Sequence, residues 1–252
     1  MVFARLIPTM LLSKGRLVKG CRFRDHEDAG HPAMTAKIYN DQMADEVLVL
    51  DIDATPERKP PNIAILKELA SRCFVPISFG GGISDMETAA AVLNQGADKF
   101  VINSAALARP QLIEEAAARF GRQAVVVAID FTNTKAGPRV VTACGTRGTE
   151  LHPVEWAKKA ERLGAGEILL TCVEREGTRT GLDLDTTRCV ADAVSVPVIA
   201  HGGVGGLDDF VAAFKSCGAS AVAAGRTFQF ADNNLIKVRR YMQQNGIELR
   251  RF

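Results

Sequence analysis

Short apolar runs alternate with longer amphipathic stretches along the whole of this 252-residue chain. The short runs are rich in Val, Ile, Leu and Ala, a pattern typical of strands that helices cover on both faces. The longer stretches carry apolar residues at helical spacing, as in 62–70 and 154–160, and Ser84-Asp85 provides a helix cap. The pattern predicts eight strands, near 6–10, 46–51, 75–79, 99–103, 124–130, 167–172, 196–200 and 221–225.

The second half of the chain repeats the first. Residues 75–82 (Val-Pro-Ile-Ser-Phe-Gly-Gly-Gly) are echoed 121 positions later by 196–203 (Val-Pro-Val-Ile-Ala-His-Gly-Gly), and 44–49 matches 165–170 at the same spacing. A duplicated half-domain explains the repeat and predicts two equivalent ligand sites. Eight strand–helix units in two copies of four indicate an α/β fold, a (β/α)8 TIM barrel. An open, doubly wound sheet is the alternative, because a count of strands does not prove closure.

We expect one domain over 1–252, with half-barrels at approximately 1–122 and 123–252. A chain of this length fits a single barrel, and no Gly/Ser-rich linker divides it. The stretches richest in turn-forming residues, near 56–61 and 132–148, are short and charged or mixed in composition, so we interpret them as loops on one body.

Composition narrows the classes of function. A hydrophobic fraction of 47% and a net charge of +2 are ordinary for a globular protein and give no reason to expect nucleic acid or a membrane as a partner. No apolar run approaches the ~20 residues that span a bilayer, so we expect a cytoplasmic protein. The six Cys and four His lack metal-ligand spacing, and neither a metal nor a cofactor is expected, although His201 could hydrogen-bond a substrate.

Glycines follow predicted strands at equivalent places in both halves. Such a loop before a helix lets backbone N–H groups approach a phosphate, although the glycines could instead only form tight turns. We predict two phosphate sites, which suit a small substrate with a phosphate at each end. The first comprises Gly81, Gly82, Asn103 and Ser104, and the second Gly202, Gly203, Gly225 and Arg226.

Acidic residues end several predicted strands. Asp130 closes a very apolar run, where a carboxylate is costly unless it faces the barrel mouth, and it is our candidate catalytic acid or base. A helix-capping role is the alternative. Asp51 and Asp53 occupy the matching end of the second strand, and Glu174 and Glu176 that of the sixth, so the mouth should be ringed by carboxylates.

Four charged residues of alternating sign begin predicted strands: Arg5, Glu46, Lys99 and Glu167. They should meet around the barrel axis at the end opposite the mouth. This end of a barrel commonly contributes stability, so a charged plug is one interpretation. The other is a gate through which a small polar molecule enters.

These residues resemble the cyclase subunit family of imidazole glycerol phosphate synthase over essentially the whole chain. The resemblance rests on an ordered set of segments: 5–8 (Arg-Leu-Ile-Pro), 15–20 (Gly-Arg-Leu-Val-Lys-Gly), 80–83 (Gly-Gly-Gly-Ile), 102–106 (Ile-Asn-Ser-Ala-Ala), 127–130 (Val-Ala-Ile-Asp) and 164–171 (Gly-Ala-Gly-Glu-Ile-Leu-Leu-Thr). It implies a two-phosphate barrel that binds a glutaminase subunit at its N-terminal face, as a heterodimer, and receives ammonia through its interior.

The resemblance also implies roles for individual residues. Arg5, Glu46, Lys99 and Glu167 would form the ammonia gate, Asp98 would lie at the glutaminase interface, and Lys19 would reach into the active site. The substrate-binding set would include Asp51, Glu176 and Gly177.

The chain departs from the family pattern at the centre of its chemistry. The family uses two aspartates, one ending the first strand and one ending the fifth. Asp130 matches the second, but Leu11 stands where the first is expected. Leucine cannot transfer a proton, and such groups typically contribute ~10²–10⁴-fold in rate. The chain departs from the family pattern at two further positions. It has Glu176 where the family tends to have Asp, and His201 where a small residue is usual.

These differences resemble a paralogous group in which the barrel, a glutaminase and a separate sugar amidotransferase supply ammonia for acetamidino groups on surface-polysaccharide (lipopolysaccharide) sugars. The resemblance therefore implies an ammonia-accepting, lyase/cyclase-type subunit of a glutamine amidotransferase complex, with ring closure weakened by Leu11. The alternative is a genuine cyclase that makes imidazole glycerol phosphate and AICAR from PRFAR in histidine biosynthesis. A related sugar-phosphate isomerase, and a conduit without chemistry of its own, stay open as further alternatives.

Overall fold

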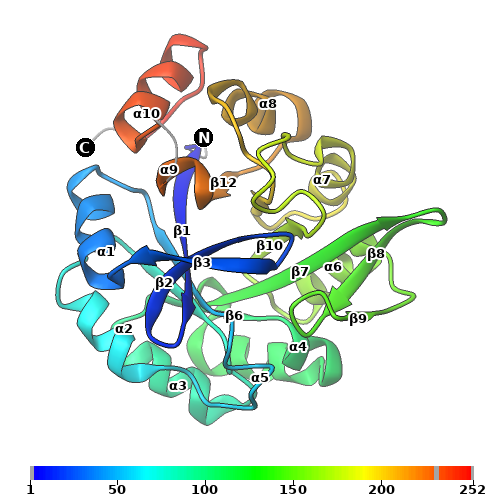
Figure 1. The fold of residues 1–252 in the computed structure, drawn as a ribbon. Coiled ribbons are helices and arrows are strands. Elements are labelled where there is room, and N and C mark those ends of the chain that lie inside the picture. Colours follow the sequence, from blue (N-terminus) through cyan, green and yellow to red (C-terminus); the bar gives the residue numbers. More distant parts are fainter. Residues whose placement is uncertain (1–2, 230–232, 251–252) are drawn as a thin grey trace.

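The computed structural model describes residues 3–229 and 233–250 and contains a closed barrel of eight parallel strands (Figure 1). The last strand pairs with the first, so no edge remains between them. This closure confirms the α/β TIM barrel and excludes the open sheet. In order around the barrel the strands are β1 (Arg5–Ser13), β4 (Val47–Asp51), β5 (Ile77–Gly80), β6 (Lys99–Ile102), β7 (Val125–Thr134), β10 (Glu167–Cys172), β11 (Val198–His201) and β12 (Ala221–Ala224).

Helices lie outside the strands (Figure 1). The cap at Ser84-Asp85 is confirmed, because Asp85 accepts a hydrogen bond from the backbone N–H of Thr88 at 2.8 Å. The described helices are α1 (Pro32–Asp41), α2 (Ile63–Ala70), α3 (Met86–Asn94), α4 (Ser104–Ala108), α5 (Gln111–Phe120), α6 (Pro153–Arg162), α7 (Leu184–Ala191), α8 (Leu207–Cys217), α9 (Arg226–Gln229) and α10 (Leu235–Gln244), with a 3-10 turn at Arg122–Ala124. None of them is long and apolar enough to cross a membrane.

An antiparallel extension of β7 (Val125–Thr134) corrects the expected loop at 132–148. β7 continues to Thr134 and pairs with β8 (Gly137–Thr142), which pairs with β9 (Arg147–Gly148). The first strand carries a similar extension, β2 (Arg16–Cys21) and β3 (Arg24–Gly30). β8 and β9 reach outward from the barrel, whereas β2 and β3 run across its middle in this view (Figure 1). β3 and β9 are mostly exposed and polar, so their sequence lacks the apolar run of a barrel strand.

The strand register makes the two halves equivalent in detail. Asp130 on β7 lies opposite Thr171 on β10, and Leu11 on β1 lies opposite Leu50 on β4. Since Leu50 and Thr171 are themselves 121 positions apart, Leu11 occupies in the first half the place that Asp130 occupies in the second.

Apolar side chains form two layers. One large cluster packs the outer faces of the strands against the helices. A smaller cluster fills the inside of the barrel and includes three alanines and several branched residues: Ile7, Leu48, Val101, Val126, Ala128, Leu169, Ile199, Ala221 and Ala223. Because residues alternate between the faces of a strand, polar groups of the same strands lie above and below this inner layer.

Candidate functional site

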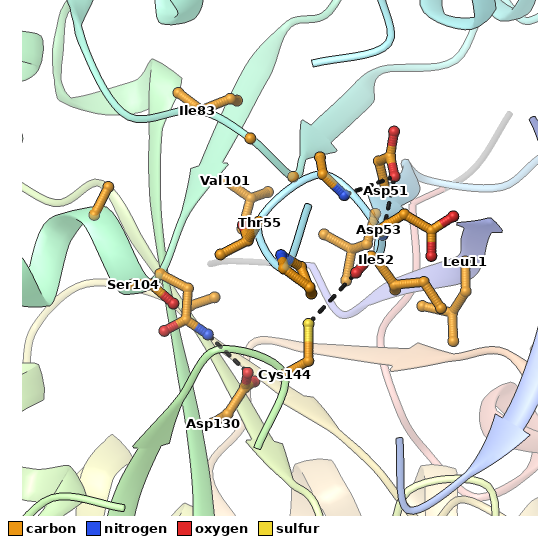
Figure 2. Close-up of a pocket in the computed structure, with 18 of the residues that line it drawn as sticks. Leu11, Asp51, Ile52, Asp53, Thr55, Ile83, Val101, Ser104, Asp130 and Cys144 are labelled. Atoms are coloured by element: carbon orange, nitrogen blue, oxygen red, sulfur yellow. Dashed lines mark hydrogen bonds between the residues drawn. The ribbon is translucent and has the colours of Figure 1, made fainter. Parts of the chain in front are cut away.

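A cavity of about 790 Å³ opens where the barrel strands end, and it gathers polar groups from both halves of the chain (Figure 2). Active sites of (β/α)8 barrels form at this end. Seven of the residues predicted to bind or transform a substrate line the cavity, and Asp53, expected at the mouth, lines it too. The seven are Asp51, Gly81, Gly82, Asn103, Ser104, Asp130 and, from the loop after β10, Glu176.

The first predicted phosphate cradle lies in this cavity. Gly81 has φ +106° and Gly82 φ +72°, and a Cβ on Gly81 would stand 2.2 Å from the Asp51 carbonyl oxygen. Only glycine fits this backbone turn, so the tight-turn interpretation holds. The same two glycines, without side chains, also face the cavity beside Ser104, where a phosphate is predicted to bind. The two interpretations of the glycines are therefore compatible.

The second predicted cradle repeats the glycine geometry but does not line this cavity. Gly202 and Gly203 have φ +91° and +109°, as close counterparts of the first pair. A Cβ on Gly225 would lie 2.5 Å from Lys19 Nζ, so the lysine occupies the space above that glycine. Gly177 and Arg226 also lie outside the lining of the cavity.

Asp130 is buried at the centre of the cavity. Its Oδ2 accepts a hydrogen bond from Asn103 Nδ2 at 2.7 Å, so the carboxylate points into the site and caps no helix. Burial raises the pKa of Asp130 to about 7; hydrogen bonds from Thr171 and Asn103 lower it, and the charge of Glu176 raises it. A carboxyl group that titrates near neutrality can act as either acid or base.

Lys19 and Glu176 are buried beside this centre. Lys19 Nζ donates to the Thr9 carbonyl oxygen at 2.7 Å. Burial lowers the pKa of Lys19 to about 7, opposed by the negative charge of Glu176. Burial raises the pKa of Glu176, opposed by Lys19, a hydrogen bond from the Phe23 backbone, and Arg226. Lys19 thus lies behind the cavity wall and Glu176 in it.

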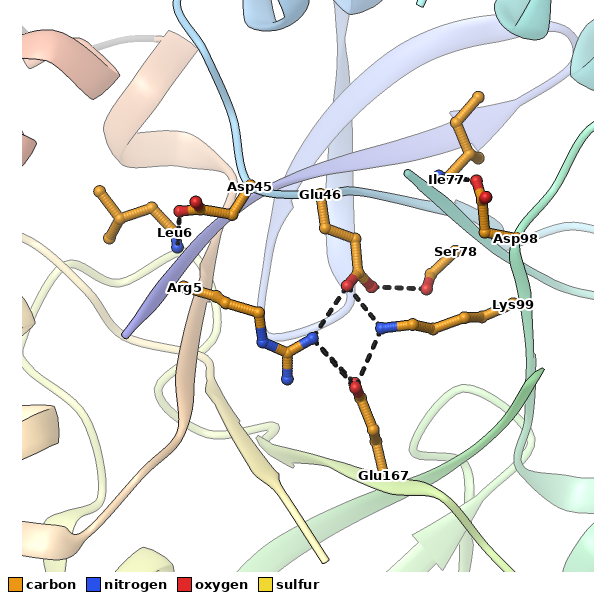
Figure 3. A network of polar contacts seen from close by, with 9 residues as sticks. All are labelled: Arg5, Leu6, Asp45, Glu46, Ile77, Ser78, Asp98, Lys99 and Glu167. Atoms are coloured by element: carbon orange, nitrogen blue, oxygen red, sulfur yellow. Dashed lines mark hydrogen bonds and ion pairs between the residues drawn. The ribbon is translucent and has the colours of Figure 1, made fainter. Parts of the chain in front are cut away.

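At the opposite end of the barrel the four predicted charges form a closed ring (Figure 3). Arg5 Nη1 lies 3.0 Å from both Glu46 and Glu167, and Lys99 Nζ lies 2.7 Å from Glu46 and 3.0 Å from Glu167. Ser78 donates a further hydrogen bond to Glu46 at 2.6 Å. Glu46 lies one residue before β4 rather than within it. The ring therefore closes the bottom of the barrel as the sequence predicted.

The family model of the histidine biosynthesis proteins matches residues 5–233. This chain belongs to that family. Its members are barrel enzymes of histidine biosynthesis, and the match includes both the ring of charges and the cavity.

Within this histidine biosynthesis family barrel, the first half lacks the polar centre of the second. Around Asp130, the neighbouring strands supply Asn103, Thr171 and His201. The counterparts around Leu11 are Gly225, Leu50 and Gly80 by strand register. Leu11 is 6% exposed and lines the cavity, so the position equivalent to Asp130 carries no proton-transfer group, although Asp51 and Asp53 line the same side of the cavity.

Asp98 is exposed beside the ring of charges (Figure 3). Its Oδ2 accepts a hydrogen bond from the Ile77 backbone N–H at 2.8 Å, so it fixes the start of β5. In the same way, Asp45 Oδ2 accepts a hydrogen bond from the Leu6 backbone N–H near the start of β1, at 2.8 Å. The other oxygen of the Asp98 carboxylate makes no hydrogen bond with the described residues. Its predicted place in a partner interface stays a prediction.

Thr171 is the site residue that the sequence analysis missed. It lies between Asp130 and His201 on adjacent strands, and its hydroxyl is 3.2 Å from His201 Nδ1. The repeat could have revealed Thr171, because this residue is the counterpart of Leu50 and places a polar side chain in an otherwise apolar strand. Among the described residues, no group of three His, Cys, Asp or Glu side chains is arranged to hold a metal.

Proposed function

We propose that this protein is the ammonia-accepting barrel subunit of a glutamine-dependent synthase, related to the cyclase subunit of imidazole glycerol phosphate synthase. It binds a glutaminase at its N-terminal face and a small phosphorylated ligand at the cavity. The observation that carries the proposal is the pairing of a closed charge ring with a cavity that contains Asp130, at opposite ends of one barrel.

The inner layer of the barrel supports the passage of ammonia. Between ring and cavity the inside of the barrel is filled by an apolar cluster that includes the small Ala128, Ala221 and Ala223, and Thr9 adds one buried hydroxyl on the same face of β1 as Ile7. An ammonium ion would lose its hydration there without compensation, whereas neutral ammonia is small and uncharged. The passage would thus favour neutral ammonia, which is the nucleophilic form, over the ammonium ion. The ion pairs of the ring join long side chains, which can separate to let ammonia enter.

The missing carboxylate supports the paralogue over a histidine-pathway cyclase. Ring closure in the cyclase uses two aspartates, and Leu11 with its apolar neighbour Leu50 occupies the first position. We infer that the barrel delivers ammonia for amidine groups on surface-polysaccharide sugars, together with a sugar amidotransferase. The genuine cyclase, which converts PRFAR, is the second candidate, because Asp130 and the first phosphate cradle are intact.

The partner test uses the glutaminase encoded in the same genome, mixed with the purified barrel. Sedimentation should show a 1:1 complex, and Asp98→Lys should weaken it at least 10-fold because it reverses a charge on the docking face. Asp185→Lys, in the exposed first turn of α7 at the opposite end of the barrel, is the matched control and should bind normally. An isolated barrel with isomerase activity and no glutaminase binding would overturn the proposal.

Nitrogen tracing separates delivery from leakage. The complex is given glutamine labelled with ¹⁵N in the side-chain amide, and labelled product is compared with labelled ammonia free in solution. Lys99→Met opens one side of the ring and should change that ratio severalfold, whereas Lys37→Met on the outer surface should not. Equal ratios in all three proteins would contradict a gate.

A further inference from the structure

His201 introduces a large polar side chain at a position where the first half has none. His201 lies opposite Thr171 in the β10–β11 register, and its counterpart Gly80 lies opposite Leu50 in β4–β5. The imidazole is buried and lines the cavity. A Cβ on Gly80 would meet Leu50 and Val101 at 2.8 and 2.9 Å, so the first half has no room for an equivalent group.

The hydrogen bonds of Thr171 determine which His201 nitrogen carries the proton. The Thr171 hydroxyl has a single proton, and its hydrogen bond to Asp130 favours the ionised carboxylate. Where Asp130 is ionised and Thr171 donates to it, Thr171 Oγ1 is left to accept from His201 Nδ1, 3.2 Å away. In the neutral ring this leaves the lone pair on Nε2, which no described residue contacts by a hydrogen bond.

The surroundings keep the ring neutral. Burial and, to a smaller extent, the positive charge of Lys19 together lower the pKa of His201 to about 4. The other titratable groups at the centre of the cavity are Asp130 and Glu176. At pH 8 His201 is therefore an acceptor of hydrogen bonds and a poor acid.

We propose that His201 is a positioning residue that accepts, through Nε2, a hydrogen bond from an N–H or O–H group of the phosphorylated ligand beside Asp130. The inference rests on the proposed function only for the ligand class. Because Leu11, Leu50 and Gly80 offer no acceptor at the equivalent place, a ligand with phosphates at both ends would bind in one of its two orientations.

The tautomer is tested by NMR on the barrel labelled with ¹⁵N-histidine, with the His201 signals assigned as those lost in His201→Gln. At pH 8 we expect a neutral ring with the proton on Nδ1. A protonated Nε2 or an imidazolium would overturn the inference. This measurement on the wild-type protein does not depend on the folding of a variant.

Binding is tested with PRFAR as the probe, by calorimetry on the isolated barrel. His201→Leu removes the acceptor and should weaken binding about 3- to 10-fold, the effect of one hydrogen bond. His201→Gln restores an acceptor and should recover most of the affinity, and His31→Gln at the start of α1 should change nothing.

Unchanged affinity in His201→Leu would overturn the inference. So would a wild-type barrel that binds no PRFAR, because the ligand class would then be wrong. If the barrel does not conduct ammonia, the NMR and calorimetry results would not change. That failure would appear only in the nitrogen-tracing assay.

Discussion

At the scale of single residues, Asp130 shows how the fold produces reactivity from an ordinary side chain. Asp130 completes an apolar strand that places it in a buried position, and the resulting desolvation raises its pKa from 3.8 to about 7. Asn103 and Thr171 hold the carboxylate without neutralising it. The burial that makes the group reactive also makes its charged form costly to the folded state.

That cost predicts a pH-dependent gain in stability for Asp130→Asn. Between about pH 4 and pH 7 the folded protein holds the Asp130 proton more tightly than the unfolded chain does, so wild-type stability falls as pH rises through this window. The variant should exceed the wild type in free energy of unfolding at pH 8 by on the order of 2–4 kcal/mol, and by less at pH 5. Urea denaturation at both pH values measures this. A difference that is the same at both would contradict the raised pKa.

At the scale of elements, the ring of charges joins strands that are distant in sequence. Arg5 starts β1, Lys99 starts β6 and Glu167 starts β10, while Glu46 precedes β4. Each carboxylate lies between two cations, and the Glu46 side chain is only 3% exposed. Removal of one partner therefore leaves charges that water cannot fully solvate.

This burial predicts that Glu46→Gln destabilises the barrel by about 3 kcal/mol. Asp41→Asn breaks the exposed Lys37–Asp41 pair on α1 and should cost at most about 1 kcal/mol. Chemical denaturation at pH 7 compares the two. Equal effects would mean that the ring contributes no more than a surface ion pair.

The sequence predicted elements where the hydrophobic pattern was strong. All eight barrel strands were predicted near their observed positions, since each is an apolar run buried on both faces. The pairs β2–β3 and β8–β9 were missed because they leave the barrel wall: β3 reads Arg-Asp-His-Glu-Asp-Ala-Gly and is mostly exposed. β2 and β8 each hold only a short apolar pair, Leu17-Val18 and Val140-Val141, which is too short to show a periodic apolar face.

At the scale of the whole molecule, the two halves share a frame but differ in chemistry. The repeat in sequence favoured a barrel and placed the first glycine pair at the end of a strand, and the charged residues that begin the strands indicated the ring. The sequence could not predict that Lys19 lies over Gly225, or that Thr171 links Asp130 to His201, since these contacts depend on strand register and side-chain packing. The structure thus places a buried carboxyl, Asp130, in one half and an apolar side chain, Leu11, at the equivalent position of the other.

The central claim is that this barrel accepts ammonia but closes the imidazole ring poorly, because Leu11 replaces a proton-transfer group. The most direct measurement is the formation of imidazole glycerol phosphate by the isolated barrel from PRFAR and an ammonium salt at pH 8, for the wild type and for Leu11→Asp. We predict a wild-type rate close to background and a gain of about 10²-fold or more in the variant, within the range that one acid–base group contributes. Rapid, ammonia-dependent product formation by the wild type would contradict the account.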